Sequence, residues 1–299
     1  MILVFGGTGQ LGQELVRMGT SQHIAVAGLS RANADIAHYS AVVDALRAYR
    51  PSLVVNAAAY TDVDGAESNR TAAVQANAHG PGMLAHACAE AGTPMLHIST
   101  DYVFAGDMSS AYVESHPINP VNAYGCTKAA GEAAVQRVHR RHVILRTSWL
   151  YGEFGKNFLK TIIRLAQQRD ELRIVADQFG SPTSTRDLAN AILRIAPRLI
   201  MNEDVWGTYH FTGSGVTSWY GFASCIVAAQ AALTGRRPKL TAITTAEFPS
   251  LARRPVNSAL DCSRFERTFG FRGSAWDDEA VKITRSVVLA QKEGAAHIA

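Results

Sequence analysis

The sequence predicts an α/β protein with a doubly wound parallel sheet and a smaller C-terminal lobe. Short apolar runs alternate with amphipathic stretches over residues 1–150, the pattern of strand–helix–strand units whose sheet is covered on both faces. A glycine-rich loop follows the first apolar run directly, and the regular alternation ends at about residue 150. Because crossovers between parallel strands are right-handed, these observations favour the Rossmann architecture.

The elements of the first half follow one another in a regular order. The run Met1–Phe5 has the length and composition of a buried strand, and Leu11, Leu15 and Met18 recur behind it at helical spacing. The predicted strands cover residues 1–5, 24–27, 53–56, 95–99 and 142–146. The predicted helices cover residues 10–18, 40–49, 66–91 with an interruption near 80–82, and 122–140.

Turn-forming residues become more frequent after residue 150, as in Phe179–Pro182 and Thr212–Gly215. Helices are predicted there over residues 157–168, 186–195, 218–233 and 277–291. No segment rich in proline or glycine marks a clean boundary. We therefore expect residues 1–150, with part of 186–215, to form the sheet domain and residues 151–299 to form mainly the smaller lobe.

Composition excludes several classes of protein. Hydrophobic residues make up 47% of the chain and charged residues 18%, which excludes a disordered chain. The net charge of +4 comes from scattered Lys and Arg, so a nucleic-acid partner is not expected. Four distant cysteines indicate reduced thiols, and neither a signal peptide nor an apolar run long enough for a membrane span is recognised. These features predict a cytoplasmic protein.

The loop between the first strand and the first helix has the glycine spacing of a dinucleotide site. It fits both GxGxxG and GxxGxxG, depending on whether Gly7 or Gly6 is taken first. Glycine lets the backbone approach a pyrophosphate, and the helix start offers free N–H groups to it. The alternative is a tight turn without a ligand. The predicted cofactor contacts of this loop are Gly6, Gly9, Gln10, Leu11 and Gly12.

The end of the second strand indicates which dinucleotide is bound. An acidic residue there would bind the ribose 2′-hydroxyl of NAD, but Ser30 and Arg31 occupy the position. A hydroxyl and a guanidinium suit a 2′-phosphate, so NADPH is predicted, with NADH possible if Arg31 is only a solvated loop residue. Other predicted contacts are Asp35 and Ile36 at the adenine end and Ala57, Ala58 and Ala59 on the groove floor.

Tyr124 and Lys128 are four residues apart, which places both side chains on one face of a helix. Carbonyl reduction needs a proton donor at the oxygen, and a lysine cation nearby is expected to lower the pKa of the tyrosine towards neutrality. Ser99 and Thr100 end the fourth predicted strand, where ligands bind in open α/β sheets. The alternative is an ordinary surface Tyr and Lys.

Several segments in one order resemble the dTDP-4-dehydrorhamnose reductases, a family of extended short-chain dehydrogenases/reductases. The resemblance extends from Met1 to about Gly270. It is carried by the glycine loop, the Tyr124–Lys128 pair, Asn56–Glu67, Ser99–Phe104, Arg146–Trp149, Tyr151–Gly152, Gly155–Phe158, Asp177–Thr183 and Arg254–Leu260.

The resemblance implies NADPH-dependent reduction of the 4-keto group of a dTDP-linked 6-deoxyhexulose to give dTDP-L-rhamnose. It implies that Tyr124 donates the proton, that Lys128 holds the nicotinamide ribose, and that Thr100 binds the sugar oxygen. The related dehydratases carry a glutamate where this chain has Tyr102, so elimination of water lacks its acid/base pair. The predicted substrate contacts are Thr100, Asp101, Tyr102, Trp149, Asn157 and Arg254, with Lys156 as a further candidate for the pyrophosphate.

Two other functions stay open. A reductase-like chain can bind NADP as a non-catalytic regulatory subunit, and another dTDP-4-keto-deoxysugar can be the substrate. The ten histidines lack the spacing of a metal site, so no catalytic metal is predicted. The expected partners are the dTDP-keto-deoxysugar and, for a homodimer, a second copy of the chain; a monomer is equally compatible.

Overall fold

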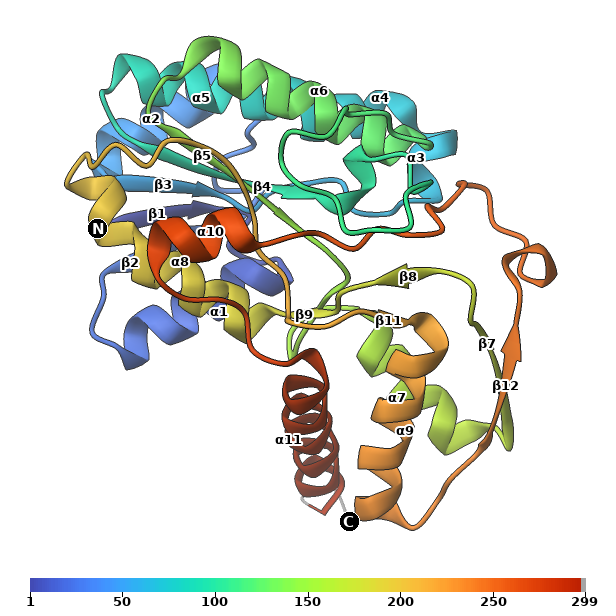
Figure 1. Cartoon of the computed structure of the whole chain (residues 1–299). Coiled ribbons are helices and arrows are strands. Elements are labelled where there is room, and N and C mark those ends of the chain that lie inside the picture. The colour runs from blue at the N-terminus through green and yellow to red at the C-terminus, as the bar shows by residue number, and fades with distance from the viewer. Residues whose placement is uncertain (297–299) are drawn as a thin grey trace.

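The computed structural model describes residues 1–296, and its centre is a six-stranded parallel sheet (Figure 1). The strand order is β10-β5-β4-β3-β1-β2. This topology confirms the predicted parallel Rossmann sheet. The strands are β1 (Ile2–Phe5), β2 (Val26–Leu29), β3 (Leu53–Asn56), β4 (Met95–Thr100), β5 (His142–Thr147) and β10 (Gly207–His210).

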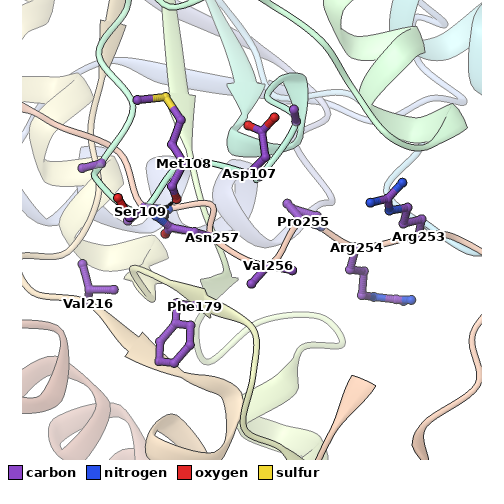
Figure 2. Close-up of a pocket in the computed structure, with 14 residues that line it drawn as sticks. Asp107, Met108, Ser109, Phe179, Val216, Arg253, Arg254, Pro255, Val256 and Asn257 are labelled. Carbon is purple, nitrogen blue, oxygen red and sulfur yellow. Dashed lines mark hydrogen bonds between the residues drawn. The ribbon is translucent and has the colours of Figure 1, made fainter. Parts of the chain in front are cut away.

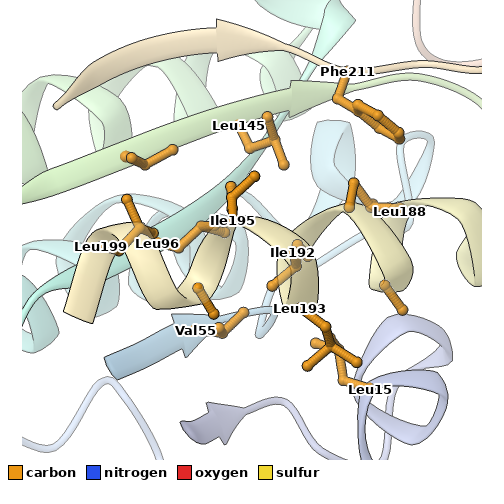
Figure 3. Packing of buried hydrophobic residues seen from close by; sticks show 14 of the residues in the cluster. Leu15, Val55, Leu96, Leu145, Leu188, Ile192, Leu193, Ile195, Leu199 and Phe211 are labelled. Carbon is orange, nitrogen blue, oxygen red and sulfur yellow. The ribbon is translucent and has the colours of Figure 1, made fainter. Parts of the chain in front are cut away.

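Helices cover both faces of this sheet (Figure 1). On one face, α1 (Gln10–Ser21) and α8 (Thr185–Ile200) pack against alternate strand residues such as Leu96 and Leu145 (Figure 3). On the other face, the intervening residues pack against helices that include α2 (Tyr39–Tyr49), α5 (Gly80–Glu90) and α6 (Ala123–Val138). Because strand side chains alternate between faces, continuous apolar runs are needed to bury both.

The predicted helix over residues 66–91 is present, but its predicted interruption is wrong. The segment consists of α3 (Gly65–Ser68), α4 (Arg70–Val74), the π-helical turn η1 (Gln75–His79) and α5. The break falls at Asn69, whose side chain accepts a hydrogen bond from the Ala72 amide. Helix α5 begins at Gly80 directly after the π-helical turn η1, so the irregularity next to Pro81 is a local change of helix type and not a break.

The smaller lobe is built around three helices, α7 (Phe158–Gln168), α9 (Trp219–Thr234) and α11 (Trp276–Ala296), whose apolar faces form a separate core. Its strands pair in twos: β12 with β7, β11 with β8, and β6 with β9. These strands are β6 (Leu150–Tyr151), β7 (Glu171–Val175), β8 (Phe179–Gly180), β9 (Thr183–Ser184), β11 (Thr217–Ser218) and β12 (Lys239–Ile243).

The sequence patterns missed all of these lobe strands, together with β10, the short helix α10 (Ser263–Phe269) and the 3-10 turns η2 (Asp101–Val103) and η3 (Thr245–Glu247). The helices of the second half are confirmed, although α8 and α11 each continue further than predicted. Strand β2 begins two residues later than predicted.

Residues well beyond position 150 complete the central sheet. Helix α8 packs on α1, and β10 pairs with β5 in parallel register from Gly207 opposite Val143 to His210 opposite Arg146. Within residues 1–296, no helix combines the length and apolar character needed to cross a bilayer.

Candidate active site

Two adjoining cavities lie along the carboxyl edge of the sheet, and each has a volume of about 540 Å³. They share Thr8, Gly9 and the segment Ala57–Ala59, so they form one groove across the glycine loop. The inner cavity is also lined by Thr100, Asp101, Tyr124, Lys128, Trp149 and Asn157. The outer cavity is also lined by Gly6, Arg31, Ala34, Asp35, Ile36 and Gln75.

The glycine loop approaches its neighbours too closely for side chains. A Cβ at Gly6, where φ is +85°, would lie 2.6 Å from the Ala58 amide nitrogen. A Cβ at Gly12 would lie 2.2 Å from the Gly6 carbonyl oxygen, which explains why Gly12 lies beneath the loop instead of lining the groove. The loop opens directly into the start of α1, and the N–H groups of a helix N-terminus suit a pyrophosphate.

Of the two predicted cofactor contacts directly after β2, Arg31 lines the groove and Ser30 does not. Arg31 lines the outer cavity with its side chain 88% exposed, and its Nε donates to Asp35 at 2.9 Å. Ser30 does not line either cavity; its hydroxyl donates to Asn33 Oδ1 at 2.6 Å. The guanidinium is therefore the cation of this loop that faces the outer cavity, and it is paired with Asp35 through Nε.

Helix α6 presents Tyr124 and Lys128 to the inner cavity one turn apart. The helix begins at Ala123 because the Asn122 side chain accepts a hydrogen bond from the Gly125 amide at 2.8 Å. Thr100 ends β4 and lines the same cavity, and its hydroxyl donates to Asp101 Oδ1 at 2.9 Å. The structure thus brings the three predicted catalytic residues into one cavity.

Burial sets the protonation of this pair. It raises the pKa of Tyr124 to about 12, against the smaller opposite effect of a hydrogen bond with Thr100. The same effect lowers the pKa of Lys128 to about 8, and its Nζ donates to the Ile98 carbonyl at 2.7 Å. The expectation that the pKa of Tyr124 is lowered towards neutrality is therefore wrong for this structure, because desolvation of the phenolate dominates and the neighbouring Asp101 raises the pKa further.

Asp101 is a buried carboxyl group at the same wall. It is 2% exposed, and burial raises its pKa to about 7. Its Oδ2 atom has no hydrogen-bond partner among the residues described. Tyr102 lies outside the inner cavity and packs edge-on against Tyr124, with ring centroids 6.1 Å apart. Tyr102 therefore supports the tyrosine without facing the groove.

Two residues of the second half complete the inner cavity. Trp149 follows β5 and stacks on Trp219. Asn157 caps α7, and its amide nitrogen donates to Gln10 Oε1 and to the Gly152 carbonyl, both at 2.9 Å. This amide consequently connects the glycine loop with the smaller lobe.

A third cavity of about 690 Å³ contains the remaining predicted contact, Arg254 (Figure 2). Its guanidinium forms two hydrogen bonds with Asp64, at 3.2 and 2.6 Å, and points away from that of Arg253 (Figure 2). Sequence reasoning missed the other lining residues because they are single side chains on loops and on the two-residue strand β8, which show no periodic pattern. They include Asp107, Met108, Phe179, Val216, Val256 and Asn257.

No group of three or more His, Cys, Asp or Glu within residues 1–296 is arranged to hold a metal ion. The groove, by contrast, has the glycine cradle that a dinucleotide site needs.

Known proteins share this sequence and fold. Residues 1–288 match the family model described as RmlD substrate binding domain. A dTDP-4-dehydrorhamnose reductase of Sinorhizobium fredii is 40% identical over 294 residues, which cover 98% of this chain and 99% of that protein.

Two solved structures are similar over nearly the whole chain. The first, a dTDP-4-dehydrorhamnose reductase from Clostridium acetobutylicum, has a TM-score of 0.89 and 38% identity, covering 96% of this chain and 99% of its own. The second, the Bacillus anthracis enzyme in complex with NADP, has a TM-score of 0.87 and 36% identity, covering 95% and 98%.

Proposed function

The chain belongs to the RmlD substrate-binding-domain family and to the dTDP-4-dehydrorhamnose reductases within it, and from this premise we propose its reaction. It reduces the 4-keto group of dTDP-4-dehydro-6-deoxy-L-mannose with NADPH and releases dTDP-L-rhamnose. The observation that carries this proposal is the meeting of Thr100, Tyr124 and Lys128 in one cavity with the glycine loop.

Tyr124 is the proton donor in this proposal. Bound NADPH supplies the hydride that reduces the carbonyl carbon, and the carbonyl oxygen then needs one proton to become the hydroxyl of the product. A phenol with a pKa raised to about 12 is fully protonated at neutral pH, so the proton is in place before the reaction. Thr100, next to the phenol, hydrogen-bonds the same sugar oxygen and fixes its distance from the phenol.

Lys128 has two roles. Its ammonium lies one helical turn from Tyr124 and stabilises the phenolate that remains after proton transfer. Only one of its three protons is needed for the Ile98 carbonyl, so the others are available to ribose hydroxyls of the nicotinamide nucleotide. The lysine therefore connects binding of the cofactor with the proton step.

NADPH would be held along the shared groove, with its pyrophosphate at Gly6, Gly9, Gln10 and Leu11 and with Gly12 beneath the loop allowing the close approach. Asp35 and Ile36 would hold its adenine end, and Ala57–Ala59 would form the floor. The exposed guanidinium of Arg31 supports a 2′-phosphate and therefore NADPH, with NADH as the alternative. Residues 1–150 with part of 186–215 then form the cofactor domain, and residues 151–299 mainly the substrate lobe.

The sugar lies against Trp149, Thr100 and Asp101, and the diphosphate extends towards Asn157, Lys156 and Arg254. The third cavity supports this direction, because it combines two arginines with the apolar side chains Phe179, Val216 and Val256. Tyr102 acts only through its contact with Tyr124.

A purified-protein assay tests the proposal. The chain is mixed with NADPH and dTDP-4-keto-6-deoxy-L-mannose, the loss of NADPH absorbance is followed, and the product is identified by nuclear magnetic resonance. NADPH binding without turnover would favour the alternative of a regulatory subunit. Turnover of other dTDP-4-keto-deoxysugars at a higher kcat/KM would favour the second alternative. A cytoplasmic location, the absence of a nucleic-acid partner, and a monomeric or homodimeric state stay predictions.

A further inference from the structure

Trp149 has a backbone conformation that bulky residues seldom adopt. It lies between β5 and β6 with φ at +46°, in the left-handed region. Such conformations persist where neighbouring groups hold them, and they concentrate at functional sites. The indole lines the inner cavity together with Thr100 and Tyr124. Its orientation therefore determines the shape of the wall that the sugar meets.

Two residues of the smaller lobe hold this indole. The ring of Trp219 stacks on that of Trp149, with centroids 3.5 Å apart and planes inclined by 5°. Gly180 lies so close that a Cβ there would be 2.6 Å from Cε2 of Trp149. Aromatic pairs usually prefer offset or edge-on arrangements with more distant centroids, so the surrounding packing keeps the two rings face to face.

Trp219 is itself fixed by neighbours outside the inner cavity. Its Nε1 donates to Gln178 Oε1 at 3.2 Å, and Gln178 Nε2 donates to Thr245 at 3.1 Å. The ring of Phe158 lies 4.6 Å from that of Trp219, between centroids. These contacts hold the indole of Trp219 from two directions, by hydrogen bonding and by packing.

The strand pair β8–β11 fixes the position of Gly180 relative to Trp219, the residue that follows β11. Gly180 pairs with Thr217, and Phe179 pairs with Ser218, the residue that caps α9 immediately before Trp219. The same strand carries Phe179 into the third cavity (Figure 2). One rigid unit of the lobe thus reaches both the sugar wall and the third cavity.

We propose that Trp219, together with Gly180, is a positioning residue that holds Trp149 in the single orientation needed to seat the keto sugar. This inference rests on the proposed function, because Trp149 is its point of contact with the substrate. Trp219 does not line the cavity, so it acts through the stack. Removal of the stack should loosen the sugar while leaving the cofactor groove and the Tyr124 proton unchanged.

Steady-state kinetics of Trp219→Leu, Trp219→Phe and Gly180→Ala test the proposal. We expect Trp219→Leu and Gly180→Ala to lower kcat/KM for the keto sugar about tenfold, mainly through KM, with the KM for NADPH and the pH profile of kcat unchanged. Trp219→Phe should recover most of the loss because a ring remains in the stack. The matched control is Trp206→Phe, a tryptophan outside all three cavities, which should leave both KM values unchanged.

Circular dichroism gives a readout independent of turnover. Two indoles stacked face to face couple their far-ultraviolet transitions, so the wild-type chain and Trp206→Phe should show a split band that Trp219→Leu lacks. If the split band disappears and kcat/KM for the sugar stays at the wild-type value, the positioning role is wrong. A wild-type chain without the split band would also overturn it. A wild-type chain that does not turn the keto sugar over would overturn the proposed function and this inference with it.

Discussion

The cofactor groove and the third cavity draw their lining from the chain in different ways. The groove takes most of its lining from the carboxyl ends of β1, β2, β3, β4 and β5 and from the first turns of α6, so its residues follow the strands of one sheet. The third cavity combines residues 105–111 with Phe179, Val216 and residues 253–259. Its walls come from segments that lie next to one another only after folding.

The two regions also differ in the groups they offer. The groove presents Gly9 and Ala57–Ala59 where its two cavities meet, and the charged side chains of Arg31, Asp101 and Lys128 each line one of the two cavities. The third cavity presents mainly side chains, including Phe179 and two arginines (Figure 2). Under the proposed function, the backbone of the glycine loop holds the cofactor, whereas side chains of the inner and third cavities hold the substrate. Substitutions in the two regions should therefore change different kinetic constants.

Tyr124→Phe should give the largest effect. Loss of the proton donor should lower kcat by roughly 10²–10⁴-fold, whereas the affinity for NADPH, measured by fluorescence titration, should stay nearly unchanged. This result would show that proton transfer and cofactor binding depend on different residues of the same groove. Activity close to wild type would show that the proton comes from another group.

Asp101→Asn should change the pH dependence of stability. Its folded-state pKa of about 7 lies above the ordinary value of 3.8, so the folded state holds the proton more tightly than the unfolded state. The free energy of unfolding of the wild type should therefore decrease as pH rises from about 4 to about 7, by up to about 4 kcal/mol. Urea unfolding across this range should give a flatter profile for the variant; parallel profiles would contradict the prediction.

Lys128→Met should weaken both kcat and NADPH binding, because one cation serves both. Burial lowers the pKa of Lys128 to about 8, below its ordinary value of 10.5, so the charged form is disfavoured in the folded state. Below pH 8 the buried charge of Lys128 should lower the free energy of unfolding of the wild type. This destabilisation should disappear as the pH rises towards 10.5, because Lys128 is then neutral in both states. Thermal unfolding near neutral pH should show the variant more stable, by up to about 3 kcal/mol. A less stable variant would refute this account.

Arg31→Ala and Arg254→Gln form the most direct test of the comparison and should give the smallest effects. We expect Arg31→Ala to raise the KM for NADPH about tenfold, with little change for NADH or for the sugar nucleotide. Arg254→Gln should do the reverse, raising the KM for the sugar nucleotide alone. If either variant raised both KM values equally, the assignment of the groove to NADPH and of the third cavity to the sugar nucleotide would be wrong.

Local sequence patterns predicted much of the fold, and β10 and the helix around Pro81 are elements that they did not predict correctly. The apolar runs of β1, β3, β4 and β5 are long enough to identify as strands, and each was confirmed. Strand β10 is Gly207–His210, a short segment with polar residues, and only its pairing with β5 makes it part of the sheet. Pro81 indicated a break that does not exist, because the preceding π turn places it at the start of α5.

The sequence by itself determined the glycine loop and the spacing of Tyr124 and Lys128, since both depend on residues within one turn or one strand–helix junction. Only the tertiary structure decided the pKa values of the Tyr124 and Lys128 side chains. The pKa of Tyr124 is raised because the folded chain excludes water from the phenol, which no local pattern encodes. The contacts of Trp149 with Trp219 and of Asp64 with Arg254 likewise join distant segments. Packing, and not sequence period, brings those pairs together.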